Sequence, residues 1–360
     1  MSFRVIVTDA NYRPSIALAQ YAKRAIPDLH LIGHSTGPSY PARWYSCYDE
    51  IVSDTPLAPF LQSAQYDMVI PVGADSVLAT SAVAPDKAVL PPRDKIEICF
   101  DKVRTLALAR EQNVPFPATR HFERGQPLDF SGIAFPCVVK AARENARGKV
   151  VRYCDDEASL KAEVAKQLET IGGNGGLLVQ ERIDGSGAGL FALCDRGKPL
   201  RVFMHQRLRE YPPTGGISVA ARAFYSERLK ELGLRLLAAL EWHGVAMVEF
   251  RRSHATGEFV LMEINGKFWG SLELSLAAGV NFAADLIRFY RGETLEADTG
   301  FDRDCEFYWP LDGDILTLWK TGALGKMRDY WRPNAHTNLG GSLMADARKS
   351  LALVYKAITT

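Results

Sequence analysis

Short apolar runs alternate with amphipathic, helix-like segments in the first quarter of the chain. Apolar runs cover residues 3–8, 29–33 and 67–72, and residues 15–25 carry their apolar side chains at helical spacing. Strands that alternate with helices favour a parallel, doubly wound sheet. The first turn, residues 8–15, lacks the G-x-G-x-x-G pattern of dinucleotide sites, so no such site is predicted. Three prolines between residues 85 and 92 predict the end of this α/β domain.

The middle of the chain has buried-strand patterns separated by charged and glycine-rich stretches. The pattern predicts a helix over residues 96–113, a strand over 135–140 and a strand over 177–183. The strand over 135–140 ends in Lys140, and a lysine there either extends to solvent or meets an anion. The polar residues 141–149 that follow are predicted to form a mobile loop.

Two further strands are predicted over residues 190–194 and 201–207, the second followed by a charged, glycine-rich loop over 208–218. Alternation along this strand would place His205, Arg207 and Arg209 on one face. Such a face could bind a carboxylate or a phosphate. The alternative is a solvated edge strand that its charges keep soluble.

Residues 245–250 and 259–264 are two apolar runs joined by a polar turn, a pattern typical of a hairpin. Each run carries one carboxylate, Glu249 and Glu263, among apolar neighbours. Asn265 lies two residues beyond Glu263 and would point to the same side of an extended strand. Two carboxylates and an amide oxygen are hard ligands suited to Mg²⁺. The alternative is a hairpin with two solvated acids on its outer face.

Composition excludes several classes of protein. Apolar residues make up 47% and charged residues 24%, as in an ordinary globular protein, and the net charge of +1 gives no reason to expect nucleic acid or an anionic membrane as a partner. No apolar run is long enough to span a bilayer. The six cysteines form no C-x-x-C, which favours reduced thiols. The N-terminus has no signal-peptide layout, so we expect a cytoplasmic protein.

An ordered set of motifs resembles the ATP-grasp superfamily, in its carboxylate–amine ligase and carbamoyl-phosphate-synthase-like branch. The set comprises D-K at Asp101 and Lys102, F-P-C-V-V-K ending at Lys140, V-Q-E-R-I-D-G, V-E-F and M-E-I-N-G-K-F-W-G-S. The resemblance covers roughly residues 1–290. It implies an α/β pre-ATP-grasp domain over 1–92 and an ATP-grasp domain over 93–292. The latter would divide into a phosphate-covering subdomain over 93–180 and a catalytic subdomain over 181–292, leaving 293–360 as a C-terminal extension without a predicted role.

The resemblance also implies roles for individual residues. Lys102, Lys140 and Arg147 would contact the ATP phosphates, and a hinge at Gln180, Glu181, Arg182 and Ile183 would meet the adenine. Glu249, Glu263 and Asn265 would hold Mg²⁺. Catalytic roles fall to Lys267, Arg207 and Arg209, and the acceptor side would be lined by His205, Arg207, Glu210, Gly215 and Gly216.

The sequence departs from the family pattern in three places. The loop over residues 141–149 carries charged residues in place of glycines, an acid for the ribose is missing from residues 185–189, and Lys267 stands where arginine is more common. Lysine keeps the charge of arginine but loses its bidentate fork.

The resemblance, together with the paired acids, the two lysines and the hinge motif, predicts an ATP-dependent ligase. With ATP and Mg²⁺ (or Mn²⁺) it would activate a small-molecule carboxylate as an acyl phosphate and join it to an amine, releasing ADP and phosphate. Two alternatives stay open: a kinase or carbamoyl-phosphate-type enzyme on the same fold, and a nucleotide-binding regulator without catalysis. A homo-oligomer is possible.

Overall fold

A computed structural model describes residues 2–38, 42–144, 151–171, 175–212, 215–296 and 300–359, with side chains described up to residue 355. The chain begins with a four-stranded parallel sheet in the order β3-β2-β1-β4. The strands are β1 (Phe3–Val7), β2 (Leu29–His34), β3 (Glu50–Val52) and β4 (Met68–Ile70). The parallel N-terminal sheet predicted from the sequence is confirmed, and β3 is the strand that the pattern missed.

Helices cover both faces of this sheet because alternate side chains of each strand point to opposite sides. Val5 and Val7 of β1 pack in the same core as α1 (Arg13–Ala25). Ile6 faces the other way and packs with α2 (Leu57–Ser63). The helix α3 (Ala74–Val83) follows β4. The sheet is therefore wound on both sides, as predicted.

The helix predicted over residues 96–113 is instead two helices, α4 (Arg93–Phe100) and α5 (Lys102–Glu111). Asp101 separates them in an extended conformation and its side chain accepts hydrogen bonds from the backbone N–H groups of Val103 and Arg104, an N-cap. The periodicity of apolar residues continued across this break, which is why the pattern alone did not reveal it. The break places Lys102 in the first turn of α5.

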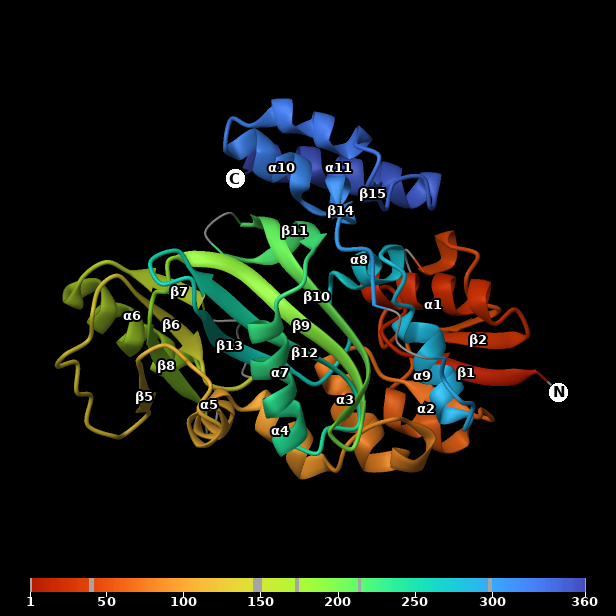
Figure 1. Cartoon of the computed structure of the whole chain (residues 1–360), viewed down its shortest axis with the longest axis horizontal. Coiled ribbons are helices and arrows are strands. Elements are labelled where there is room, and N and C mark those ends of the chain that lie inside the picture. Colours follow the sequence, from red (N-terminus) through yellow and green to blue (C-terminus); the bar gives the residue numbers. More distant parts are fainter. Residues whose placement is uncertain are drawn as a thin grey trace.

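A four-stranded antiparallel sheet, which we call the cover sheet, follows in the order β5-β8-β6-β7. Its strands are β5 (Thr119–Glu123), β6 (Cys137–Ala141), β7 (Val151–Cys154) and β8 (Gly176–Glu181). The helix α6 (Glu157–Thr170) packs Leu160 and Val164 against Val139 and Val179 of this sheet. Figure 1 shows the cover sheet and α6 at the opposite end of the molecule from the N-terminal domain.

A seven-stranded sheet, the large sheet, forms the centre of the molecule in the order β13-β12-β9-β10-β11-β14-β15. Its strands are β9 (Gly185–Asp195), β10 (Lys198–Tyr211), β11 (Ile217–Ala223), β12 (Gly244–Ser253), β13 (Phe259–Asn265), β14 (Glu306–Tyr308) and β15 (Ala335–Thr337). The helix α7 (Glu227–Ala239) shares a core with one face, and α8 (Leu272–Ala277) and α9 (Phe282–Tyr290) share a core with the other.

The hairpin predicted from two apolar runs is confirmed as β12 and β13. Two other segments differ from the prediction. Strand β9 begins at Gly185, ahead of the strand predicted over 190–194, and β10 continues through Tyr211 into the predicted loop.

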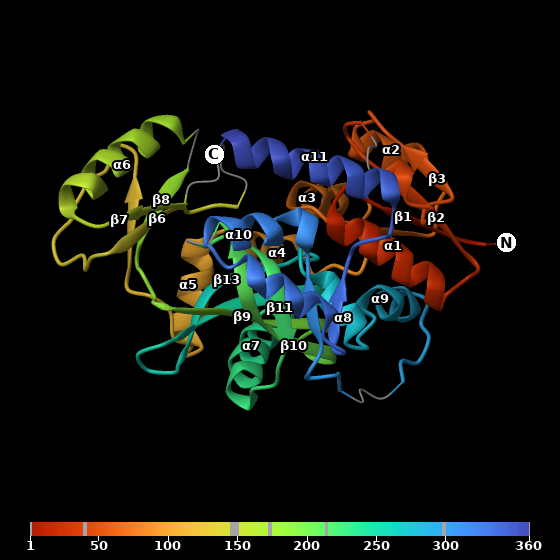
Figure 2. The ribbon, with the colours of Figure 1, turned by 90° about the horizontal axis from the view of Figure 1, so that it is seen from above.

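The C-terminal segment does not stand apart from the large sheet. Its strands β14 and β15 extend that sheet beyond β11, and four helical pieces accompany them: η3 (Pro310–Asp312), α10 (Asp314–Lys320), η4 (Leu324–Trp331) and α11 (Leu343–Thr359). Figures 1 and 2 show these helices over one end of the large sheet, with α11 running from the N-terminal domain toward the cover sheet. None of the helices that the structure describes is long and apolar enough to cross a membrane.

Candidate active site

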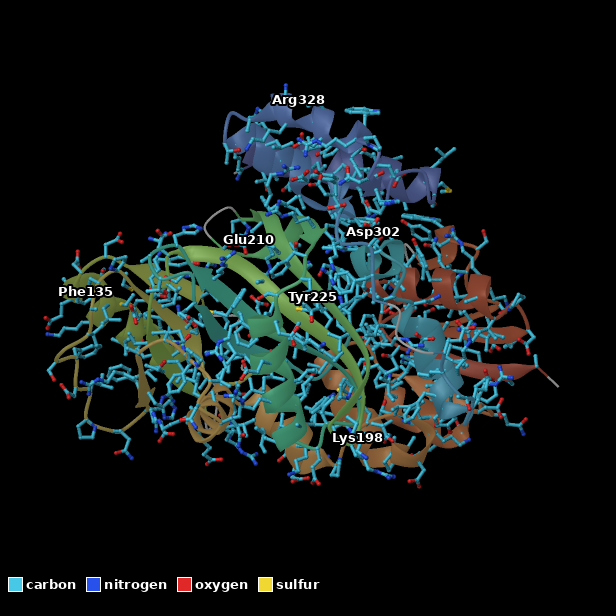
Figure 3. The ribbon with its side chains drawn as sticks, in the orientation of Figure 1. Phe135, Lys198, Glu210, Tyr225, Asp302 and Arg328 are labelled. Carbon is cyan, nitrogen blue, oxygen red and sulfur yellow. The ribbon has the colours of Figure 1, made fainter. Side chains whose placement is uncertain are left out.

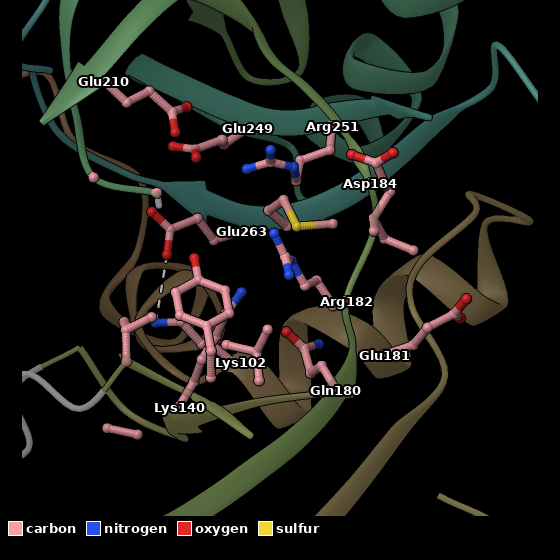
Figure 4. A pocket seen from close by; sticks show the side chains of 18 of the residues that line it. Lys102, Lys140, Gln180, Glu181, Arg182, Asp184, Glu210, Glu249, Arg251 and Glu263 are labelled. Carbon is pink, nitrogen blue, oxygen red and sulfur yellow. Dashed lines mark ion pairs between the residues drawn. The ribbon is translucent and has the colours of Figure 1, made fainter. Parts of the chain in front are cut away.

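A cavity of about 520 Å³ lies between the cover sheet and the large sheet. Side chains from β6, β7 and β8 line one wall, and side chains from β10, β12 and β13 line the other. Figure 4 shows that lysines and carboxylates from these two walls point toward one another. The cavity therefore brings together residues that are far apart in the sequence.

Two lysines enter the cavity from different elements. Lys102 Nζ lies 3.5 Å from a carboxylate oxygen of Glu263, and Lys140 is the fourth residue of β6. Burial lowers the pKa of Lys140; the carboxylate of Glu263 partly opposes this, and the charge of Lys102 adds to it. Burial acts the same way on Lys102, but Glu263 and Glu144 outweigh it and raise its pKa. Two lysines that line one cavity form a natural position for phosphate oxygens.

Glu249 and Glu263 are direct cross-strand partners on β12 and β13. Burial would raise the pKa of Glu263, but Lys102, the amide of Asn265 and nearby lysines outweigh it and lower the pKa to about 2. The pKa of Glu249 is raised because burial and repulsion from Glu263 exceed the stabilisation by Arg207. Two ionised carboxylates in this arrangement repel each other, and a bound cation would remove that repulsion.

Asn265 and Lys267 extend this polar network. The Asn265 amide donates to Glu263 at 2.8 Å, and Lys267 donates to the Asn265 side-chain oxygen at 2.9 Å. Lys267 also forms an ion pair with Glu144 at 2.8 Å, next to the predicted phosphate loop. Asn265 is thus positioned beside Glu263, as expected from the two-residue spacing.

The donor set fits a hard divalent cation. Among the described residues no group of three or more His, Cys, Asp and Glu side chains could hold a metal ion. The predicted set has only two carboxylates, with the Asn265 oxygen as a third donor. Such a sparse set leaves coordination positions for phosphate oxygens and water, which is how Mg²⁺ is commonly bound at nucleotide sites.

Arg207 of β10 reaches Glu249 of β12 across the intervening strand β9. Its guanidinium lies 2.6 Å from Glu249 and 3.2 Å from Glu210, and it donates to the carbonyl oxygen of Gly216 at 3.1 Å. Burial would lower its pKa, but Glu249 and Glu210 raise it, so the group stays charged. The intervening strand β9 makes this possible: a Cβ on Gly187 would lie 2.7 Å from Arg207 Cδ.

The position of Arg209 contradicts the predicted shared face. The pairing between β10 and β11 shifts by one residue between Arg207 and Arg209, a β-bulge, which breaks the alternation. Arg209 therefore points to the C-terminal segment, where it forms two hydrogen bonds with Asp314, at 2.6 and 2.7 Å. It does not line the cavity between the two sheets.

His205 is also not on the cavity wall. Its side chain is 2% exposed and packs edge-on against Phe191, with ring centroids 4.6 Å apart. Burial, together with the charge of Arg207, lowers its pKa to about 3. His205 is enclosed by its neighbours and does not line the cavity, so its position does not fit the expected contact with substrate.

The hinge residues line the cavity at the end of β8. Gln180 is buried and donates to the Thr119 hydroxyl at 3.0 Å, and the backbone N–H of Glu181 bonds to Ala118 at 2.9 Å. The Arg182 guanidinium lies over the ring of Tyr153. In Figure 4 the Glu181 carboxylate lies at the edge of the view, away from Glu263. The Glu181 backbone N–H is already paired with the residue that precedes β5.

The remaining predicted residues divide into two groups. Ile183, Glu210, Gly215 and Gly216 line the cavity. Arg147 lies outside the described residues.

Sequence reasoning assigned no role to Glu144, Tyr153, Arg251 and Met262, which also line the cavity. Arg251 could have been found, because it follows Glu249 by two residues on the same strand and so shares its face. Glu144 and Tyr153 come from elements that only the fold brings near β13.

No family model and no curated protein matches the chain. Solved structures do. The ADP complex of an N5-carboxyaminoimidazole ribonucleotide synthetase superposes with a TM-score of 0.70 at 13% identity, over 98% of this chain and 96% of that one. An L-amino acid ligase from Bacillus licheniformis gives 0.66 at 16% identity, over 84% and 78%.

A third structure is the biotin carboxylase domain dimer of the Hydrogenobacter thermophilus 2-oxoglutarate carboxylase, in complex with MgADP, ADP and bicarbonate. It gives a TM-score of 0.66 at 15% identity, over 85% of this chain and 74% of that one. These neighbours are ATP-grasp enzymes. The chain has the ATP-grasp fold, preceded by the parallel N-terminal sheet that its sequence predicted.

Proposed function

We propose that this protein is an ADP-forming ligase that activates a carboxylate with ATP and joins it to an amine. One observation carries the proposal. The opposed pair Glu249 and Glu263 lies in one cavity with Lys102 and Lys140, and Arg207 forms an ion pair with Glu249. Acids for a metal, lysines for phosphates and an arginine for an acceptor anion are the parts that phosphoryl transfer to a carboxylate needs.

The nucleotide would enter along the hinge. Residues 180–183 would meet the adenine through the backbone, while Lys102 and Lys140 would neutralise the phosphate oxygens as point charges. Glu249, Glu263 and Asn265 would hold Mg²⁺, which supplies charge neutralisation on the transferred group. The ADP and MgADP held by two of the structural neighbours support this choice of cofactor.

Arg207 would bind the acceptor carboxylate. An oxygen of that carboxylate attacks the γ-phosphorus and the bond to the bridging oxygen of ADP breaks, which gives an acyl phosphate and ADP. The amine nitrogen then attacks the acyl carbon, loses a proton, and phosphate leaves with the electron pair of the broken C–O bond. A guanidinium fork suits both the carboxylate and the acyl phosphate. Arg207 is now shared with Glu249 and Glu210, so the substrate would replace one of these partners.

The test is product analysis. The purified chain is incubated with ATP, Mg²⁺ and a matrix of carboxylates and amines, with the Glu263→Gln variant prepared in parallel to reveal contaminating ATPase activity. The proposal predicts ADP and phosphate in a one-to-one ratio with the amide. Formation of AMP and pyrophosphate would overturn it.

Hydroxylamine separates the ligase from an enzyme that releases a phosphorylated product. With a ligase, hydroxylamine traps the acyl phosphate as a hydroxamate, and only when the carboxylate is present. A stable phosphorylated product that accumulates without any amine would identify a kinase or a carbamoyl-phosphate-type enzyme instead.

A further inference from the structure

A second cavity, of about 490 Å³, adjoins the first. Its lining comes from the beginning of β9, the end of β10, Arg251 of β12 and His254 just after it, and from α10, the turn that follows and η4. Arg207, Glu210 and Arg251 line both cavities and so form the wall between them. The C-terminal segment, none of whose described residues lines the first cavity, closes one side of the second.

The charges around this second cavity are unequal. Arg209 is neutralised by Asp314, and Arg207 by Glu249 and Glu210. Arg251 and Lys326 are different, because no carboxylate in the described part of the chain forms an ion pair with either. The cavity therefore offers two cations without counter-ions.

Arg251 shows a second sign of an absent partner. Its terminal nitrogen donates to the carbonyl oxygen of Gly185, but its Nε is buried and has no hydrogen-bond partner. A buried N–H without an acceptor is unfavourable, and such groups usually bind a ligand or water. Figure 4 shows Arg251 and Glu249, two residues of β12, among the side chains that line the first cavity.

We propose that the second cavity binds a small organic anion, and that its occupant is the distal carboxylate or phosphate of the acceptor substrate. The second part rests on the proposed function. An acceptor whose reacting carboxylate lies at Arg207 can place another anionic group on the other side of the shared wall, near Arg251 and Lys326. The substrate class is therefore a dicarboxylate or a phosphorylated carboxylic acid, and a simple monocarboxylate would be a poor substrate.

This assignment gives the C-terminal segment a role. Thr317, Thr321 and Lys326 all line the second cavity and all lie beyond residue 292. The bidentate pair between Arg209 and Asp314 fastens α10 to the end of β10, which fixes the position of this wall. The segment would select the acceptor while the rest of the chain handles the nucleotide.

Binding is measured first, without turnover. Tricarballylate, a tricarboxylate probe, is titrated calorimetrically into protein saturated with MgADP, so that the first cavity holds nucleotide. We expect one tricarballylate site per chain. Lys326→Gln should weaken it about fivefold, in line with an exposed ion pair, and Arg251→Gln more than tenfold because its charge is partly buried.

Arg328→Gln is the matched control. Arg328 comes from the same short helix η4 and is also exposed, but it lies outside the second cavity, at the outer edge of the molecule in Figure 3. It should bind tricarballylate as the wild type does. Lys326→Glu, a charge reversal on an exposed side chain, should abolish binding without unfolding the protein. Equal affinity in the wild type, Lys326→Gln and Lys326→Glu would overturn the site.

A kinetic arm separates this inference from the proposed function. ADP release is compared for glutarate and butyrate with the same amine. The wild type should prefer glutarate, and Lys326→Gln should reduce that preference about fivefold. Amide formation with equal use of both acids would leave the ligase intact and overturn the cavity assignment. Tricarballylate binding with the expected variant pattern, but no ADP from any pair, would uphold the anion site and reject the ligase.

Discussion

Arg207 and Arg209 are two residues apart on the same strand, and each lies 2.6 Å from a carboxylate, yet their surroundings differ completely. Asp314 is fully buried and both of its oxygens are used, by Arg209 and by the hydroxyl of Tyr330. Arg207 and Glu249 line an open cavity beside a second carboxylate and two lysines. The pair in the cavity can exchange partners, whereas the buried pair is closed.

The comparison shows that the identity and spacing of a charged pair do not decide its use. A saturated, buried pair holds two segments together, and breaking it leaves an uncompensated charge. A pair that also faces unsatisfied charges and open volume can exchange partners with a ligand. Five substitutions test this distinction.

Glu263→Gln should have the largest effect on the cavity side. Removing one anionic ligand weakens the metal where charge develops in the transition state, so ADP formation should fall by about a thousandfold or more. Much of the ATP affinity should remain, because the hinge and the lysines are intact. A coupled assay of ADP release measures turnover, and calorimetry with an ATP analogue measures nucleotide affinity. Near wild-type turnover at ordinary Mg²⁺ would mean that the metal assignment is wrong.

Arg209→Ala should cause the largest loss in the free energy of unfolding. It leaves Asp314 buried without its partner, and breaking such a pair costs about 3–5 kcal/mol of unfolding free energy. Denaturant unfolding measures it, with the exposed Arg328→Ala as the control. A loss within about 0.5 kcal/mol, typical of surface substitutions, would contradict the closed-pair interpretation.

Arg207→Ala should act on the acceptor side. Losing a bidentate partner for a carboxylate typically costs about 2–5 kcal/mol, seen as a rise in KM for the carboxylate or a fall in kcat. The Kd for an ATP analogue should change little. Arg207→Lys, which keeps the charge without the fork, should recover part of the loss. Lost nucleotide affinity with unchanged carboxylate kinetics would instead place Arg207 on the nucleotide.

Lys140→Ala should weaken ATP binding by about 2 kcal/mol while adenosine binding stays unchanged, because the substitution removes a contact to phosphate only. Calorimetric titration of both ligands into both proteins gives the comparison. Equal losses for ATP and adenosine would indicate a distorted β6 and reject the phosphate role.

Gly187→Ala should have the smallest effect and tests how Arg207 is positioned. The new Cβ would lie 2.7 Å from Arg207 Cδ and 2.9 Å from a Glu210 oxygen, so the arginine must shift. Overpacking of this kind costs about 1–3 kcal/mol, and we expect a corresponding rise in KM for the carboxylate with little change in nucleotide affinity. Gly325→Ala, where an added Cβ meets nothing within 4 Å, is the control. Identical carboxylate KM values in both variants would show that β9 does not position Arg207.

Local patterns in the sequence were sufficient to predict several features. The alternation of apolar runs with helix-like segments predicted the parallel N-terminal sheet, and two apolar runs joined by a polar turn predicted the β12–β13 hairpin. Side-chain spacing placed Asn265 beside Glu263. The motif order indicated the ATP-grasp fold that the structural neighbours share. These features could be predicted because strand and helix periods are properties of short segments.

Other features depend on partners distant in the chain and emerged only from the folded structure. An irregular pairing of β10 with β11 turned Arg209 away from Arg207, and Phe191 of β9 packs against His205. Strands β14 and β15 joined the large sheet, which brought α10 beside β10 and created the second cavity. Periodicity cannot reveal such outcomes, because a bulge shifts every later side chain to the other face and a cavity exists only once its walls have packed.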